Sequence, residues 1–268
     1  MEGDCIPADV DSMRASFVLF LDGLSGGGDF AFIKALLKAV KSGRNVVLLS
    51  TRHSPEHYEA LFKKSMLDLR LGNIRSHVKI MYLVPGNLVD GLIGQEEIDR
   101  VSAANKFYPC AHYDWNSFEA WMSSTLQLER NDDYGEKEAL FIDDLDTFEA
   151  VAPSRAAARK MTSKLLSCVH TSKGGAIDLL VAKGNLLWAD FEEHAQSVPE
   201  NPEPSLTEVC KYRANYTVQV VPLSTGFSND VHGMVKATGM KEGLMKCEEF
   251  TFKTVNVNTV QFTRLSRE

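Results

Sequence analysis

The strongest constraint in the sequence is the repeated alternation of short apolar runs with segments of helical periodicity over the first 185 residues. The runs that predict strands are residues 16–23, 45–50, 78–84, 138–144 and 176–182. Helical spacing of apolar residues predicts helices over 30–42, from a Ser54 cap onward, over 117–129 and over 154–170. Strands that are apolar almost throughout are typical of a parallel sheet with helices on both faces. The sequence therefore predicts an α/β fold, although it does not determine the strand order.

The pattern changes after a loop at 198–205, which contains three prolines. Four shorter segments with alternating residues follow, at 216–221, 231–238, 249–255 and 259–265. The last two are separated by Asn256, Val257 and Asn258, which predicts a hairpin. We therefore expect one domain over residues 1–268. It would comprise an N-terminal tail at 1–15, an α/β core at 16–185 and an antiparallel, β-rich extension at 206–268.

The acidic balance of the chain limits its partners. A formal net charge of −7 argues against a free-standing duplex-DNA binder, because such proteins present a basic face. Residues 205–268 hold 8 basic and 6 acidic side chains, so a phosphate-facing surface is better expected there. The candidates by regional charge are Lys211, Arg213, Lys236 and Lys241.

Five scattered cysteines without a C-x-x-C pair argue against a disulfide framework and a zinc site. The chain has no long apolar run and no basic, apolar leader, so neither a membrane span nor a secretory signal is predicted. We expect a soluble protein with reduced thiols, located in the cytoplasm or also in the nucleus, without a metal or cofactor.

A glycine-rich turn joins the first expected strand to the first expected helix. Gly23 and Gly28 have the spacing of a phosphate-binding P-loop, G-x-x-x-x-G-K-[ST]. Asp29, however, stands where the loop needs the lysine that neutralises phosphate, and Phe30 stands where a hydroxyl would bind magnesium. The charge reversal replaces an attraction for phosphate by a repulsion. The turn is therefore either a decayed P-loop or an ordinary glycine-rich connection.

The run from Ala139 to Asp144 resembles the second motif of such nucleotide sites, an apolar strand that ends in aspartate. There Asp143 or Asp144 would hold magnesium-bound water, although an aspartate after a parallel strand can equally cap the next turn. Adjacent residues on a strand point to opposite faces, so the two would not share one site. Together the two motifs predict a RecA-like fold that has lost nucleotide hydrolysis.

Three histidines are candidates for metal binding or acid–base chemistry. His53 and His57 have a metal-ligand spacing, but no third ligand is evident. The simpler interpretation is that His53 precedes the helix and His57 is solvated. His232 follows Asp230 closely, and the pair could act as a general base. No serine or cysteine nucleophile has a matching setting, which favours a structural, hydrogen-bonded turn.

The stretch from Leu223 to Gly233, L-S-T-G-F-S-N-D-V-H-G, closely resembles a motif of the Elongator complex protein six family. The matching positions are Leu223, Thr225, Gly226, Asp230, Val231, His232 and Gly233. Local identity is high over about residues 216–236, and elsewhere the match is one of organisation: length, a RecA-like core without a working P-loop, and a β-rich end. The related fourth and fifth Elongator subunits are the nearest alternatives.

The resemblance implies a non-catalytic subunit of a hetero-hexameric ring formed with Elongator subunits four and five. That ring is expected to dock on the catalytic Elongator subunits one, two and three, to contact transfer RNA, and so to support modification of its wobble uridine. The sequence leaves open a different class of function, an ATPase that uses a noncanonical phosphate loop with Asp143 or Asp144 on magnesium.

Overall fold

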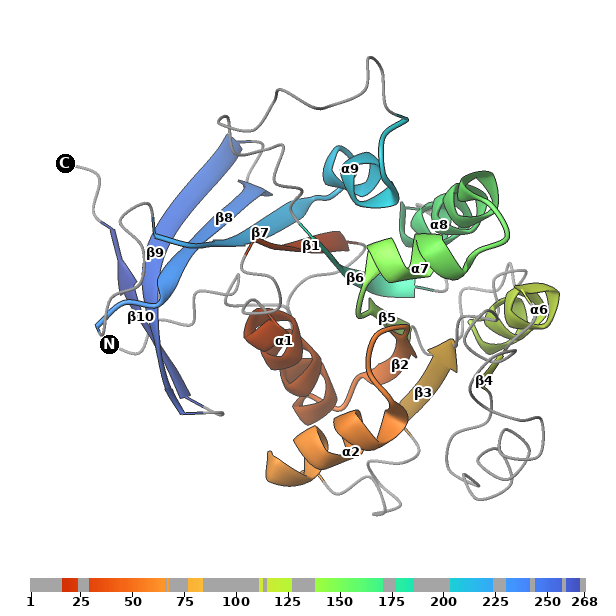
Figure 1. The fold of residues 1–268 in the computed structure, drawn as a ribbon, viewed down its shortest axis with the longest axis horizontal. Coiled ribbons are helices and arrows are strands. Elements are labelled where there is room, and N and C mark those ends of the chain that lie inside the picture. Colours follow the sequence, from red (N-terminus) through yellow and green to blue (C-terminus); the bar gives the residue numbers. More distant parts are fainter. Residues whose placement is uncertain are drawn as a thin grey trace.

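A computed structural model describes residues 16–23, 29–65, 67, 77–83, 111–112, 115–126, 138–170, 177–185, 203–223, 230–241, 244–256 and 259–265. These residues build one ten-stranded sheet, in the order β10-β9-β8-β7-β1-β6-β5-β2-β3-β4 (Figure 1). The strands are β1 (Ser16–Asp22), β2 (Asn45–Ser50), β3 (Val78–Leu83), β4 (Ala111–His112), β5 (Glu138–Ile142), β6 (Ile177–Asn185), β7 (Tyr216–Val221), β8 (Gly233–Lys241), β9 (Leu244–Asn256) and β10 (Thr259–Arg264).

The predicted fold class is confirmed. All pairs from β7 to β4 are parallel, and β8, β9 and β10 add antiparallel strands beyond β7. The middle of the parallel part is fully buried, as the apolar runs require: Phe17, Val18 and Leu19 of β1 are inaccessible to solvent. Strands that are distant in the chain, such as β1 and β6, are neighbours in the sheet.

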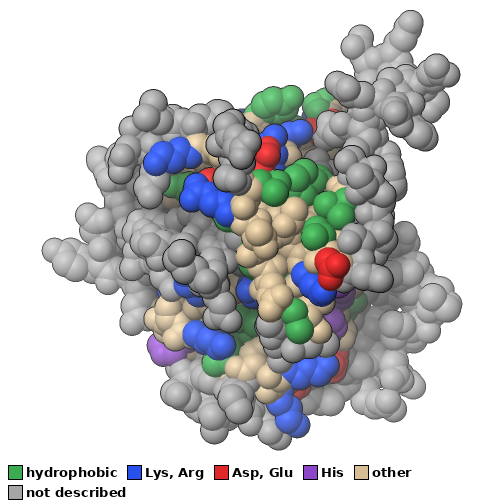
Figure 2. Space-filling model, turned by 90° about the vertical axis from the view of Figure 1, so that its left-hand side faces the viewer, with side chains coloured by type: hydrophobic (Ala, Val, Ile, Leu, Met, Phe, Trp, Pro, Cys, Tyr) green, Lys and Arg blue, Asp and Glu red, His purple; other side chains and the backbone are tan. Residues whose placement is uncertain are grey.

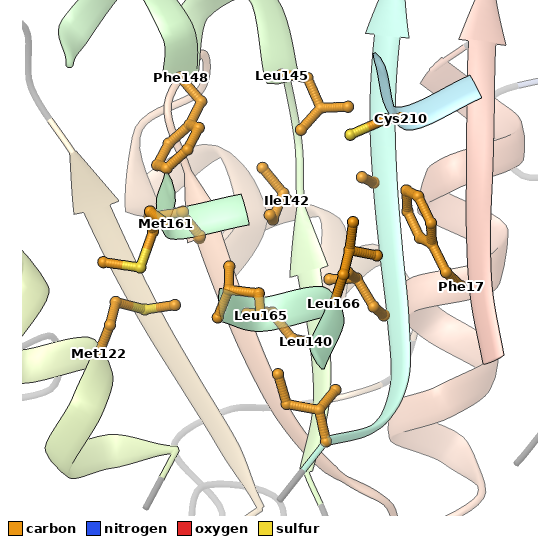
Figure 3. Close-up of a cluster of buried hydrophobic side chains, with 14 of the residues drawn as sticks. Phe17, Met122, Leu140, Ile142, Leu145, Phe148, Met161, Leu165, Leu166 and Cys210 are labelled. Carbon is orange, nitrogen blue, oxygen red and sulfur yellow. The ribbon is translucent and has the colours of Figure 1, made fainter. Parts of the chain in front are cut away.

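Helices cover both faces of the sheet (Figure 1). One face carries α1 (Asp29–Lys41) and α2 (Pro55–Lys64), and their apolar residues join those of the strands in one core cluster. The other face carries α6 (Trp115–Thr125), α7 (Leu145–Val151), α8 (Arg155–His170) and α9 (Leu206–Lys211). In this second cluster Phe148 of α7, Leu165 of α8 and Met122 of α6 pack against Leu140 and Ile142 of β5 (Figure 3).

Several predicted boundaries were wrong. The expected strand 138–144 ends at Ile142, so Asp143 and Asp144 lie in the connection to α7. Strand β8 begins at Gly233 and not at residue 231, and β9 begins at Leu244, well before the predicted residue 249. Helices α7 and α9 and the two-residue β4 were not predicted. Ser54 precedes α2 as expected, but its side chain makes no cap hydrogen bond.

The described cysteines are free thiols: Cys168, Cys210 and Cys247. Burial raises the pKa of Cys168, and it raises that of Cys210 to about 12, so both stay protonated at neutral pH. Cys5 and Cys110 lie outside the described residues. Among the helices that the structure describes, none is long and apolar enough to cross a membrane.

Candidate functional site

The candidate site lies where the central strands β1, β6, β5 and β2 end. These four strands are adjacent and parallel, so the residues at their carboxyl ends meet at one edge of the sheet. This edge is where open α/β sheets bind their ligands. It gathers Asp22 from β1, Lys183 from β6, Asp143 after β5 and the segment 50–53 after β2.

Asp29, at the P-loop lysine position, is the first residue of α1 and lies beside two cations and a histidine ring. Its Oδ1 accepts a hydrogen bond from Lys183 Nζ and lies 3.7 Å from Arg52 Nη1. Its Oδ2 lies 3.9 Å from His53 Nε2. The Lys183 side chain is only 2% exposed, and its Nζ also lies 3.9 Å from Asp22 Oδ2. The Asp29 carboxylate thus neutralises the buried Lys183. The negative charge at the P-loop lysine position is therefore paired within the chain.

Phe30, at the position of the magnesium-binding hydroxyl, packs against the C-terminal extension. Its ring centroid lies 4.8 Å from that of Phe252 in β9 and 6.2 Å from that of Phe262 in β10. Lys34, one helical turn later, places its Nζ 5.2 Å from the centroid of Phe262. This position therefore anchors α1 to the antiparallel strands. Gly23 donates its backbone N–H to the Val220 carbonyl at 2.7 Å, and Gly28 lies outside the described residues.

Asp143 is buried, and its carboxylate organises the connection from β2 to α2. Its Oδ1 accepts hydrogen bonds from the backbone N–H and the hydroxyl of Thr51, at 2.7 and 2.9 Å. Its Oδ2 accepts from the hydroxyls of Ser50 and Tyr58, at 2.7 and 3.0 Å. Burial and the neighbouring Asp143 charge raise the pKa of Tyr58, which keeps this phenol protonated as a donor. The Asp143 carboxylate thus accepts its hydrogen bonds from groups of the same chain.

Asp144 is the N-cap of α7. Its Oδ1 accepts from the backbone N–H groups of Asp146 and Thr147, at 2.9 and 3.1 Å. Burial raises the pKa of this carboxyl, although the hydrogen bond from Thr147 opposes the shift. The two adjacent aspartates therefore serve different elements. The predicted reason, opposite faces of one strand, was wrong, because β5 ends at Ile142.

His53 and His57 stack on each other, with ring centroids 4.3 Å apart and an interplanar angle of 15°. Desolvation, followed by the proximity of His57, lowers the pKa of His53, and the nearby Asp143 and Asp29 only partly oppose this. His53 is therefore neutral at pH 7 and can donate one ring N–H. Within the part of the chain that the structure describes, no cluster of three or more metal-ligating side chains is found.

Three described residues of the Leu223–Gly233 motif, Asp230, His232 and Gly233, have structural contacts. Asp230 pairs with Lys253 at 3.1 Å, and His232 Nδ1 accepts the backbone N–H of Thr254 at 3.1 Å. A Cβ atom at Gly233 would lie 2.7 Å from the Phe252 ring and 2.9 Å from the Val221 carbonyl oxygen, so glycine makes room for the ring that packs on Phe30. Leu223 and Val231 are half-buried, and Thr225 and Gly226 lie outside the described residues.

The basic candidates from the C-terminal region differ in their surroundings. Lys236 pairs with Glu249 at 3.6 Å, and the side chain of Lys241 is outside the described part. On the face that carries the C-terminal strands, the lysines and arginines that the structure describes lie in separate places (Figure 2). Lys211 and Arg213 flank Tyr212, which is 89% exposed at the end of α9.

Sequence interpretation missed Lys183 and Arg52, the strongest cations around Asp29. The signal for Lys183 was present, because it is the one basic residue within the mostly apolar β6 run, I-D-L-L-V-A-K-G-N. A lysine in a fully buried strand requires a counter-ion. Its partner could not be named from sequence, because Asp29 and Lys183 are brought together only by the pairing of β1 with β6.

No family model matches the chain, and no curated protein matches its sequence. Solved structures do match its fold. One is a KaiC-like protein from the hyperthermophilic archaeon Pyrococcus horikoshii, with a TM-score of 0.57 and 10% sequence identity, covering 93% of this chain and 90% of that one. At this identity the likeness shows the fold alone. The chain has a RecA-like fold, as the two motifs predicted.

We expect Asp143→Ala to destabilise the protein far more than Tyr58→Phe. Asp143→Ala leaves several buried donors without an acceptor and should lower the free energy of unfolding by about 3 kcal/mol or more. Tyr58→Phe removes one hydrogen bond and should lower it by about 1–2 kcal/mol. Urea unfolding of both variants measures the difference. Equal losses would contradict the organising role of Asp143.

The free energy of unfolding should also decrease as the pH is lowered, because His53 becomes protonated more readily in the unfolded chain. The pKa of His53 is lowered in the folded protein, so below about pH 6.5, the ordinary histidine value, the unfolded chain binds more protons and folding weakens. Unfolding midpoints at pH 7.5, 6.5 and 5.5 should drop for the unmodified chain, less for His57→Gln, which removes the neighbouring ring, and least for His53→Gln. An identical pH profile for all three proteins would exclude this origin.

Proposed function

We propose that this chain is a non-catalytic structural subunit of a hetero-hexameric RecA-like ring, formed with Elongator subunits four and five. In this proposal the ring docks on the catalytic Elongator subunits one, two and three, and it supports modification of the wobble uridine in transfer RNA. The Leu223–Gly233 resemblance supports the choice of complex. The RecA-like fold supports the ring, because subunits of one kind of fold can associate head to tail until the assembly closes.

The non-catalytic role is supported by the hydrogen bonds that three aspartates make within the chain. Asp29 is bound to Lys183 within the chain, Asp143 holds the β2–α2 connection, and Asp144 caps α7. The alternative, an ATPase with a noncanonical loop, would require Asp143 or Asp144 to leave these hydrogen bonds for magnesium. It would also require a triphosphate to displace or tolerate the Asp29 carboxylate.

The transfer-RNA contact of the ring is best placed, in this proposal, at the turn formed by Lys211, Tyr212 and Arg213. The turn is rigidly attached, because Asn215 is fixed to β1: its side chain accepts from Phe17 N at 2.7 Å and its N–H donates to Phe17 O at 2.9 Å. An exposed aromatic ring between two cations suits an unpaired base on a phosphate backbone.

The assembly is tested by native mass. Co-expressed with Elongator subunits four and five from its own organism, the chain should purify in a six-membered assembly with two copies of each subunit, without added nucleotide. A monomer, with the other two subunits assembling without it, would contradict the proposal. Nucleotide binding is checked separately on the isolated chain: a ligand at 100 times its Kd would stabilise it by about 2.7 kcal/mol, and we expect no such shift.

The RNA contact is tested on the assembled ring. Tyr212→Ala should weaken transfer-RNA binding by roughly 5- to 150-fold, because loss of one base–aromatic stack costs about 1–3 kcal/mol. Tyr212→Phe is the matched control and should bind within about twofold of the unmodified ring, since the ring face remains. Fluorescence anisotropy at one fixed salt concentration measures both. Unchanged binding of the alanine variant would remove this turn from the contact surface.

A further inference from the structure

The outward face of helix α1 combines apolar and basic side chains. The residues that face the sheet are buried: Ala31, Phe32, Ala35, Leu36, Ala39 and Val40. The opposite face carries the half-buried Ile33 and Leu37 beside three lysines, Lys34, Lys38 and Lys41. We call these five residues the α1 stripe. Apart from its first residue the helix has no acidic side chain, so the α1 stripe presents positive charge next to accessible hydrocarbon.

The two ends of the α1 stripe have different surroundings. Near the start of the helix, the Lys34 Nζ lies 5.2 Å from the centroid of the Phe262 ring, which also contacts Phe30. Ile33, in contrast, is neither a member of the two core clusters nor packed against them in the part of the chain that the structure describes. Accessible apolar side chains framed by charges are typical of a contact surface.

The N-terminal tail has the complementary composition. Residues 1–15, which lie outside the described part of the chain, contain four acidic side chains and one basic side chain: Glu2, Asp4, Asp9, Asp11 and Arg14. The apolar Ile6 and Val10 stand among the acidic residues. We propose that this tail docks on the α1 stripe of its own chain, with its carboxylates on the lysines and its apolar side chains on Ile33 and Leu37.

The tail joins the fold beside the basic end of α1. Ser16, the first residue of β1, is in register with Leu179 of β6. The residue before Leu179 is Asp178, whose Oδ2 lies 3.5 Å from Nη1 of Arg44, and Arg44 comes just after the end of α1. The tail therefore begins about one strand spacing and one arginine side chain away from the end of the helix that carries Lys41.

The tail is also long enough to cover the α1 stripe. A helix of 13 residues is about 20 Å long, whereas 15 residues in an extended conformation span up to about 50 Å. Asp9 and Asp11 are closer to Ser16 than Ile6 is, so they would meet the lysines at the end of the helix while Ile6 reaches towards Ile33. Exposed ion pairs are individually weak, but a tethered segment binds at a high effective concentration. This favours the chain's own tail over a free acidic peptide.

The first experiment is carbodiimide cross-linking of the isolated, full chain, because this reagent joins a carboxylate only to an amine in contact with it. The lysines at the end of α2, Lys63 and Lys64, are exposed and provide a matched control for charge attraction alone. We expect links from the tail to the α1 lysines to exceed those to the α2 lysines by at least about fivefold, since docking holds the tail at one surface. Equal yields would overturn the proposal.

The second experiment adds a labelled peptide of residues 1–15 to the unmodified chain and to a variant with Asp9→Lys and Asp11→Lys. The tail of the variant should no longer dock, because it would bring lysines against lysines. Anisotropy should therefore show at least about tenfold tighter peptide binding to the variant, since the intact tail competes in the unmodified chain. Equal affinity for both proteins, or no binding to either, would contradict docking.

Two further variants locate the peptide on the surface. In the tail-reversed chain, Lys34→Glu with Lys41→Glu should abolish the gain in peptide affinity, whereas Lys63→Glu with Lys64→Glu should retain it. Loss of the gain in both would assign the binding to general charge and overturn the proposal. If the α1 variant does not fold, the cross-linking of the unmodified chain decides. All measurements use the isolated chain, so their outcome is independent of whether the chain enters the proposed ring.

Discussion

The hydrogen bonding of the Asp143 carboxylate is the interaction on which the rest of the candidate site depends. It joins the end of β5 to the end of β2 through Ser50 and Thr51, and to α2 through Tyr58. These bonds fix the main chain that carries Arg52 and His53, and those two residues approach Asp29. An acidic residue at the place of a magnesium-binding aspartate thus acts, within this chain, as the organiser of a neighbouring loop.

Most of the fold could be predicted because the central parallel strands are buried on both faces and the later strands alternate. The runs at 45–50 and 216–221 coincide with β2 and β7, since apolar continuity or alternation determines such strands. Helix α9 was missed because its six residues are too few for a periodic pattern; a capping box of Ser205 and Glu208 defines its start. Strand order could not be predicted, because the pairing of β1 with β6 joins residues far apart in the chain.

The candidate site was only partly accessible to sequence interpretation. The charge at Asp29 and the ring at Phe30 predicted the loss of phosphate-loop chemistry, because that prediction depends on residue type alone. Their new partners depend on tertiary structure: Lys183 comes from β6, and Phe252 and Phe262 come from β9 and β10. Gly233 belongs to the Leu223–Gly233 motif, but the sequence does not show that it makes room for the Phe252 ring.

Asp29 and Phe30, the two positions that differ from the P-loop pattern, therefore contact different parts of the protein. At Asp29 the reversed charge is balanced by Lys183, so the pair brings no net charge into the buried edge of the sheet. At Phe30 an aromatic ring replaces a metal-binding hydroxyl and attaches α1 to the antiparallel extension, which a hydroxyl could not do. A functional phosphate loop gains its order from a bound nucleotide and metal. Here the same positions are held by a lysine and by two phenylalanines of the same chain, so their order does not require a ligand.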